Sequence, residues 1–388
     1  MNAFDNIYNK MIEVENNFKS PAIMAVIVRN GGDYNLQALR GVRKSDAGSI
    51  SNNQLKGSDQ FCLGSVSKPI SGYLISYLVQ EGKLKWDTKI SDVFTELKNP
   101  NCRKHFNISE DYLNATVAQM MTHTAFFPWA PSNSIEIVLG NNKPDINRNY
   151  EKEYCNELSV MQRRYNYLLS AQQDPKAKFG QYNGGPIIPI AMAERITRKS
   201  YNQLIKELVF DRLGMSNAVT GRSATSSVIP DGVWQHQYDD NNKKFVPQVS
   251  GTFLTTYNYS AHSPAGAVHL SSSDVVQMIT SLFPENGKIK KVVNNRMLKE
   301  SLIPFANNFA LSGWGSGGTG NDLQISHDGD DGMCYCHATI YPMKGQGFMV
   351  FSSGGGGNGN VGQKIVYGVV DEIRRMFSSW KSLYPNEG

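Results

Sequence analysis

The chain has 388 residues, of which 19% are charged and 40% apolar, a balance that is ordinary for a globular protein. The formal net charge of +5 is small for this length, and no basic run alternates with aromatic residues, so we expect no nucleic-acid partner. Residues 1–6 lack the basic start of a secretory signal, and no stretch approaches the roughly 20 apolar residues of a membrane helix. We therefore expect a cytoplasmic protein without a membrane partner.

The first elements along the chain are a helix and a hairpin. Apolar residues at three- and four-residue spacing predict an amphipathic helix over residues 3–18. Residues 22–28 form a mostly apolar run that ends at two glycines, which predicts a strand entering a turn. A second strand over about residues 36–42 would complete the hairpin, and the polar segment 44–58 then crosses to the next element.

That next element contains Ser65-Val66-Ser67-Lys68, followed by apolar residues at helical spacing. On a helix Ser65 and Lys68 are neighbours, and Ser65 would lie in the first turn, where unbonded N–H groups favour a developing anion. A serine hydroxyl becomes a nucleophile when a nearby base takes its proton, and a lysine is such a base only when its pKa is lowered. Taken alone, the pair also fits a helix N-cap with a surface lysine.

The remaining elements are a short helix, two strands and a final helix. Thr116 predicts the N-cap of a helix that reaches residue 124, residues 334–341 and 348–351 predict apolar strands, and residues 366–378 predict an amphipathic helix. Two glycine clusters lie between strand signals and lack the Lys-Ser/Thr ending of a phosphate loop. We interpret them as turns or site rims; they are residues 313–320 and 354–359.

The five cysteines are odd in number and scattered, at positions 62, 102, 155, 334 and 336, which is typical of free thiols in a reducing compartment. Cys334, Cys336 and His337 could be imagined as metal ligands. Alternate positions on a buried strand explain the two cysteines better. We therefore expect no metal and no cofactor.

Taken in order, several segments resemble the serine β-lactamase-like family, which includes class C β-lactamases, D-alanyl-D-alanine peptidases, D-aminopeptidases, esterases and transacylases. The matched segments run from about residue 21 to about residue 373. They are Ser65-Val66-Ser67-Lys68, residues 116–124, Arg212-Leu213-Gly214-Met215, residues 263–274, Gly313-Trp314-Gly315 and His327-Asp328-Gly329.

The resemblance implies an α+β fold of the β-lactamase/transpeptidase-like type, in which an antiparallel sheet is flanked by helices and carries an inserted, mostly helical lobe. Residues 1–64 and 215–388 would form the lobe with the sheet. Residues 65–214 would form the helical lobe, and the active site would lie between the two.

The resemblance also implies the site. Ser65 would be the nucleophile and Lys68 the general base, and the N–H groups of Ser65 and Asp330 would form an oxyanion hole. His327 and Gly329 would line the substrate-binding edge.

Two departures from the family pattern affect the expected chemistry. The family's Tyr-x-Asn element corresponds here to a stretch in which Asn183 keeps its place as a substrate-binding residue and Gln181 takes the place of the tyrosine. Glutamine cannot act as a base, so either Lys68 works alone or the loop turns Tyr182 toward the serine. Residues 327–331 replace the Lys-Thr-Gly of carboxylate-binding relatives with a histidine and three aspartates, which disfavours an anionic substrate end.

We therefore expect a cytoplasmic serine hydrolase or acyltransferase that acts on an ester, thioester or amide of a small metabolite through an acyl-Ser65 intermediate. The alternative is a non-catalytic binding protein that kept the cleft after losing the tyrosine. The retention of Ser65, Lys68 and Asn183 together favours the enzyme. The acyl donor, the acceptor and the oligomeric state cannot be predicted from the sequence.

Overall fold

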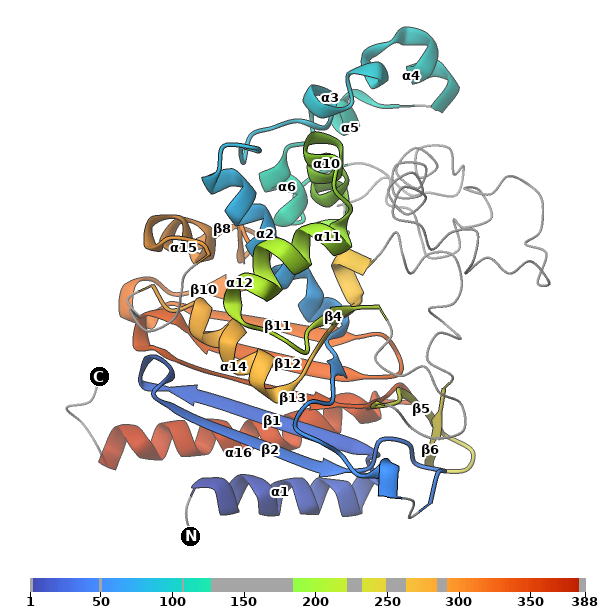
Figure 1. Ribbon diagram of the computed structural model, residues 1–388, viewed down its shortest axis with the longest axis vertical. Coiled ribbons are helices and arrows are strands. Elements are labelled where there is room, and N and C mark those ends of the chain that lie inside the picture. Colours follow the sequence, from blue (N-terminus) through green and yellow to red (C-terminus); the bar gives the residue numbers. More distant parts are fainter. Residues whose placement is uncertain are drawn as a thin grey trace.

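The computed structural model (Figure 1) describes residues 3–48, 51–106, 108–126, 184–221, 232–248, 263–284 and 292–383. At its centre is an eight-stranded antiparallel sheet in the order β2-β1-β13-β12-β11-β10-β9-β8. Strands from the two ends of the chain are neighbours, since β1 pairs with β13. The strands are β1 (Ala22–Arg29), β2 (Tyr34–Gly41), β8 (Pro304–Ala306), β9 (Phe309–Ala310), β10 (Gly315–Gly317), β11 (Gln324–Asp330), β12 (Tyr335–Tyr341) and β13 (Gln346–Ser352).

Helices cover both faces of this sheet, which explains why β1 is apolar along its whole length. Met24 and Val26 belong to the core on one face, whereas Ile23 and Ile27 belong to the core on the other, as the alternation of side chains along a strand requires. The second core is closed by α1 (Ala3–Phe18) and α16 (Val361–Leu383), which run along the same face in Figure 1. The predicted first helix, hairpin and final helix are confirmed.

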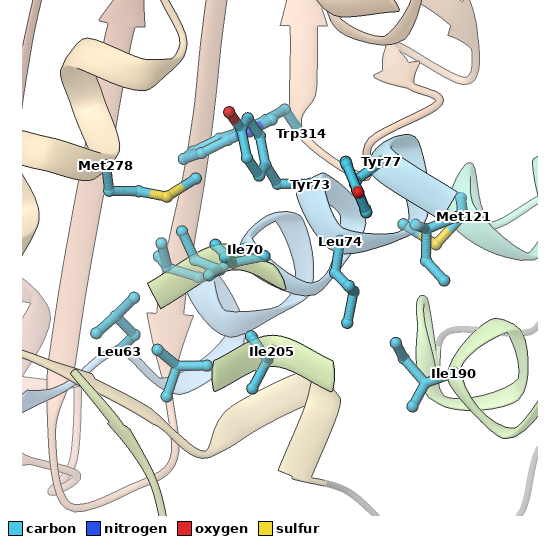
Figure 2. Close-up of a cluster of buried hydrophobic side chains, with 14 of the residues drawn as sticks. Leu63, Ile70, Tyr73, Leu74, Tyr77, Met121, Ile190, Ile205, Met278 and Trp314 are labelled. Atoms are coloured by element: carbon cyan, nitrogen blue, oxygen red, sulfur yellow. The ribbon is translucent and has the colours of Figure 1, made fainter. Parts of the chain in front are cut away.

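The opposite face carries α14 (Ser272–Ser281) and α2 (Ser67–Gln80). Figure 2 shows Ile70 and Leu74 of α2 among apolar side chains from several other elements, including Met278 of α14. The apolar spacing predicted a helix with one buried face. The structure instead buries α2 nearly all round from Ser67 to Leu78, with Lys68 half-buried, because the sheet lies on one side and other helices lie on the other.

Among the short helices, α3, α4, α5, α6 and α10 lie farther from the sheet than α2 does, at the top of Figure 1. The threonine cap predicted at residue 116 is confirmed, because the Thr116 hydroxyl accepts from the Gln119 N–H while the Gln119 side chain accepts from the Thr116 N–H. The division into two lobes stays a prediction. The helices are α3 (Ile90–Val93), α4 (Pro100–Phe106), α5 (Glu110–Asn114), α6 (Val117–Met121), α10 (Ile187–Thr197), α11 (Tyr201–Ile205), α12 (Asp211–Leu213) and α15 (Asn295–Leu302).

Two small three-stranded sheets complete the fold. One contains β3 (Phe61–Cys62), β7 (Val268–Leu270) and β4 (Val219–Thr220), and the other contains β14 (Gly354–Gly355), β5 (His236–Asp239) and β6 (Lys244–Pro247). The glycine clusters that we interpreted as turns or rims therefore also contribute strands β10 and β14. Gly315 pairs so closely with β11 that a Cβ there would lie 2.9 Å from the Ser326 carbonyl oxygen.

Within the described ranges, no helix is long and apolar enough to cross a membrane.

Candidate active site

Ser65 lies at the point where β3 turns into α2. It occupies the middle of a single 3-10 turn, η3 (Gly64–Val66), and α2 begins directly afterwards. The Leu63 N–H donates to the Val268 carbonyl at 3.0 Å, which ties the entry to this turn to β7. Because the first N–H groups of a helix have no acceptor within the helix, the half-buried Ser65 lies where backbone donors are available.

The backbone of this turn is in close contact with the end of β11. A Cβ on Gly64 would lie 2.8 Å from the Asp330 nitrogen, and a Cβ on Gly329 would lie 1.9 Å from the Leu63 oxygen and 3.1 Å from the Ser65 nitrogen. The N–H groups of Ser65 and Asp330 are thus brought to the same contact, as an oxyanion hole requires. Gly64, which also has a φ of +51°, was missed by our sequence reasoning. Its position directly before the serine could have indicated a close backbone contact at the nucleophile.

Lys68 lies one turn along, and its side chain runs beside Gly185. A Cβ on Gly185 would lie 3.3 Å from Lys68 Cδ and 3.6 Å from His123 Cε1. Burial lowers the pKa of the Lys68 amine to about 8. Among the described residues, no carboxylate lies within ion-pair distance of Lys68 to raise that pKa again. A large share of the Lys68 amines is therefore neutral near pH 8.

His327 lies on β11 near Lys68, and its imidazole is neutral at pH 7. Burial, and then the positive charge of Lys68, lower its pKa to about 4. Its Nδ1 lies 2.6 Å from the carbonyl oxygen of Asp328. Because a carbonyl only accepts, Nδ1 carries the proton and Nε2 is left as an acceptor.

His123, just beyond α6, also lies close to the site, since a Cβ on Gly185 would contact both it and Lys68. Its ring approaches Phe309 edge-on at 4.7 Å between centroids, and its charge contributes to the lowered pKa of His327. It also has a φ of +56°, a conformation that is uncommon outside glycine and is found in strained functional sites.

The three aspartates after His327 do not form one acidic group beside Ser65. The Asp328 carboxylate lies 2.9 Å from His337 Nδ1 and accepts from the Tyr367 hydroxyl of α16 at 3.1 Å. Burial acts to raise its pKa, but these two partners lower it. Asp330 accepts from Asn360 Nδ2 at 2.7 Å, and Asp331 accepts from two backbone N–H groups. Alternation along β11 directs Asp328 toward α16. That residues 327–331 disfavour an anionic substrate end stays a prediction.

The structure thus brings Ser65, Lys68, His327, Gly329 and Asp330 to one region. The other predicted site residues, Gln181, Tyr182 and Asn183, lie outside the described residues.

Comparisons with known proteins agree with this fold. The sequence matches the family model described as Beta-lactamase over residues 18–367, and a search with it among curated proteins found no match. Similar solved structures include SurE (15% identity, TM-score 0.68, covering 96% of this chain and 75% of that one) and the octameric penicillin-binding protein homologue from Pyrococcus abyssi (17%, 0.65, 91% and 74%). Another is the D-alanine carboxypeptidase AmpC from Burkholderia cenocepacia (13%, 0.63, 95% and 98%).

At these identities the similar structures show the fold, whereas the family model covers most of the chain. The chain therefore belongs to the beta-lactamase family and has the α+β, β-lactamase/transpeptidase-like fold that its sequence predicted.

Proposed function

We propose that this protein is a serine hydrolase or acyltransferase that acts on an ester, thioester or amide of a small metabolite through an acyl-Ser65 intermediate. The observation that carries the proposal is the contact between η3 and β11, where a Cβ on Gly329 would lie 3.1 Å from the Ser65 nitrogen and one on Gly64 would lie 2.8 Å from the Asp330 nitrogen. Two backbone donors held in this way stabilise an oxyanion as it forms, because they need no rearrangement during the reaction.

Lys68 is proposed as the base because burial lowers its pKa to about 8. The neutral amine takes the proton of the Ser65 hydroxyl while Oγ attacks the acyl carbon, and the carbonyl electrons move onto the oxygen. When the tetrahedral intermediate collapses, the leaving group departs with the proton that Lys68 returns. Water or an acceptor alcohol or amine then attacks the acyl-serine. Lys68 takes the proton of this attacking group and returns it to Ser65 Oγ as the acyl group leaves.

The charge at the substrate edge supports a preference for substrates without a carboxylate near the reacting bond. His327 stands where carboxylate-binding relatives carry a lysine, and its imidazole is neutral with a pKa of about 4. Its Nε2 is an acceptor, because Nδ1 donates to Asp328. An acceptor at this place suits a substrate hydroxyl or ammonium group better than an anion.

Labelling with a fluorophosphonate, followed by intact-protein and peptide mass spectrometry, tests the nucleophile. The phosphorus should bond to Ser65 Oγ with loss of fluoride, and the adduct should disappear in Ser65→Ala. Ser67→Ala is the matched control, since the buried Ser67 hydroxyl accepts from the Val268 N–H at 3.0 Å and has no role in the proposed chemistry. Labelling that persists in Ser65→Ala, or a folded wild-type chain that is never labelled, would contradict the proposal; the second result is the one expected of a non-catalytic binding protein.

A panel of acyl substrates then tests the reaction. It should hold neutral short-chain esters, the matching thioesters and amides, a cephalosporin and D-leucine methyl ester, the last because one similar structure is that of SurE with D-Leu. We expect an acyl adduct on Ser65 from at least one neutral ester or from the aminoacyl ester, and negligible cephalosporin turnover.

A further inference from the structure

Beside the candidate active site lies a second group of reactive side chains, which the proposed reaction does not use. Cys62 ends β3, Asp331 follows β11, and Cys334 directly precedes β12. Their ligand atoms all lie within 4.8 Å of one another. Cys62 is 5% and Cys334 1% exposed. Two thiols and a carboxylate from two separate parts of the fold, the end of β3 and the β11–β12 connection, therefore meet in a site largely closed to water.

His269 lies at the edge of this group. It is the direct cross-strand partner of Cys62 in the β3–β7 pair, so the two side chains lie on the same face of that pair. His269 Nδ1 lies 3.1 Å from the Ala267 carbonyl oxygen, so Nδ1 donates and Nε2 keeps its lone pair. A metal-binding histidine has this arrangement, in which one nitrogen donates to a carbonyl and the other is free to coordinate.

One backbone donor reaches Cys62 and three donors hold Asp331. The Gly64 N–H donates to Cys62 Sγ at 3.5 Å, and Cys62 Sγ lies 3.8 Å from Asp331 Oδ2. The Gln235 amide and the N–H groups of Met333 and Cys334 bond the same carboxylate. These donors hold the Asp331 carboxylate toward the thiols, as hydrogen bonds from surrounding groups hold a metal ligand in place.

We propose that Cys62, Cys334 and Asp331, with His269 as the fourth ligand, form a binding site for a structural zinc ion. Two sulfurs, one imidazole nitrogen and one carboxylate oxygen are ligands that Zn²⁺ takes in tetrahedral sites. A divalent cation also offsets the cost of grouping buried acidic side chains, which is high when such groups have no opposite charge.

The ion would join the two segments that form the predicted oxyanion hole. Cys62 lies three residues before Ser65 on β3 and η3, and Asp331 directly follows Asp330 at the end of β11. Fixing these segments to each other holds the η3–β11 contact in place. The sequence alone could not indicate this site, because Cys62 and Cys334 are far apart along the chain. Cys336 is close to Cys334 in sequence, but its side chain lies in the apolar core and not in this group.

Metal content tests the proposal without any measurement of activity. Full-length protein expressed in zinc-supplemented medium and then gel-filtered should contain about one zinc per chain. Cys334→Ser and Cys62→Ser should lose it. Cys336→Ser is the matched control, because Cys336 is also a buried cysteine of the same segment, and it should keep its zinc. Circular dichroism shows whether each variant folds.

A cobalt titration of the wild-type protein tests the site even where a variant fails to fold. Wild-type protein stripped of metal and titrated with Co²⁺ should develop a thiolate-to-cobalt charge-transfer band and the d–d bands of a tetrahedral site, saturating at one equivalent. Absence of those bands, zinc retained undiminished in folded Cys62→Ser, or a Cys62–Cys334 disulfide in the freshly purified protein would each overturn the proposal. A failure of the proposed acyl chemistry would leave these readouts unaffected.

Discussion

The backbone of Gly64 lies against that of Asp330, so closely that a Cβ on Gly64 would lie 2.8 Å from the Asp330 nitrogen. The contact places the residue before the predicted nucleophile against the second predicted oxyanion donor. Because only backbone atoms meet, no side chain has to move for the two donors to stay in register. This rigidity is what electrostatic stabilisation of a transition state needs.

We expect Gly64→Ala to lower the acylation rate by on the order of 10²-fold, the loss seen when one oxyanion donor is displaced. The φ of +51° at Gly64 adds strain of about 1–2 kcal/mol for a residue with a Cβ. Gly82→Ala is the control for that strain, since Gly82 has a φ of +68° but nothing lies within 4 Å of its Cβ position. Fluorophosphonate labelling rates and thermal melts of both variants separate the effects, and equal labelling of the two variants would contradict the oxyanion role of this contact.

The rate of acylation should rise with pH and level off above about pH 8. Lys68 accepts the serine proton only when it is neutral, and burial lowers its pKa to about 8, so the rate should fall about tenfold per pH unit below that value. His327, with its pKa of about 4, does not titrate in this window. Stopped-flow acylation between about pH 6 and 10 measures the profile.

Lys68→Ala should lose that pH dependence together with most of the rate. A wild-type rate that stays flat across the window would exclude Lys68 as the base.

The lowered pKa of Lys68 also affects stability, because the unfolded chain binds more protons than the folded one between pH 8 and the ordinary lysine pKa of 10.5. The contribution of Lys68 to the free energy of unfolding is therefore lost as the pH falls through this range.

Removing one partner of the ion pair between Arg43 and Asp59 should lower the free energy of unfolding strongly. The guanidinium donates to both carboxylate oxygens, at 2.9 and 2.6 Å, and the side chains are only 7% and 4% exposed. Asp59→Ala would remove the carboxylate that pairs with a buried guanidinium and should lower the free energy of unfolding by about 3–5 kcal/mol. Urea denaturation measures this change.

Glu13→Ala is the comparison for that experiment, because Glu13 is paired with Lys10 at 2.7 Å but is 56% exposed. Its removal should change the free energy of unfolding by less than about 1 kcal/mol. If the two variants lost the same stability, burial would not be what makes the Arg43 pair strong.

Local pattern predicted the elements that face a core. Three of the predicted elements depend on local interactions alone, and the structure contains all three. They are the helix predicted from the apolar spacing of residues 3–18, the strand predicted from the apolar run of β1, and the helix that begins after the threonine cap at Thr116. The glycine-rich β10 was missed because glycine has no side chain with which to show a strand's alternation.

Contacts between distant segments were predictable only where a family motif fixes both sides. The resemblance paired Ser65 with Asp330, but the tight fit at Gly64 and the meeting of Cys62 with Cys334 leave no local pattern, because each arises from backbone packing between segments far apart in sequence. The direction of Asp328 followed from alternation along β11, once the bounds of that strand were known.

The neutral His327 should make the protein prefer substrates without a carboxylate near the reacting bond. In wild-type protein the imidazole is neutral, with its Nδ1–H bonded to the Asp328 carbonyl, so it offers no positive charge to a carboxylate. Pairs of esters that differ only by a carboxylate near the reacting bond should therefore be turned over with a preference for the neutral member.

His327→Lys should shift that preference toward the carboxylate by at least about tenfold in kcat/KM. A unit charge several ångströms from an anion contributes roughly 1–4 kcal/mol in a partly wet site, and about 1.4 kcal/mol corresponds to tenfold. His327→Gln, which is neutral, should keep the wild-type preference, and raising the salt concentration should shrink the gain of the lysine variant. If His327→Lys and His327→Gln gave the same ratio, the charge at this position would not set the choice of substrate.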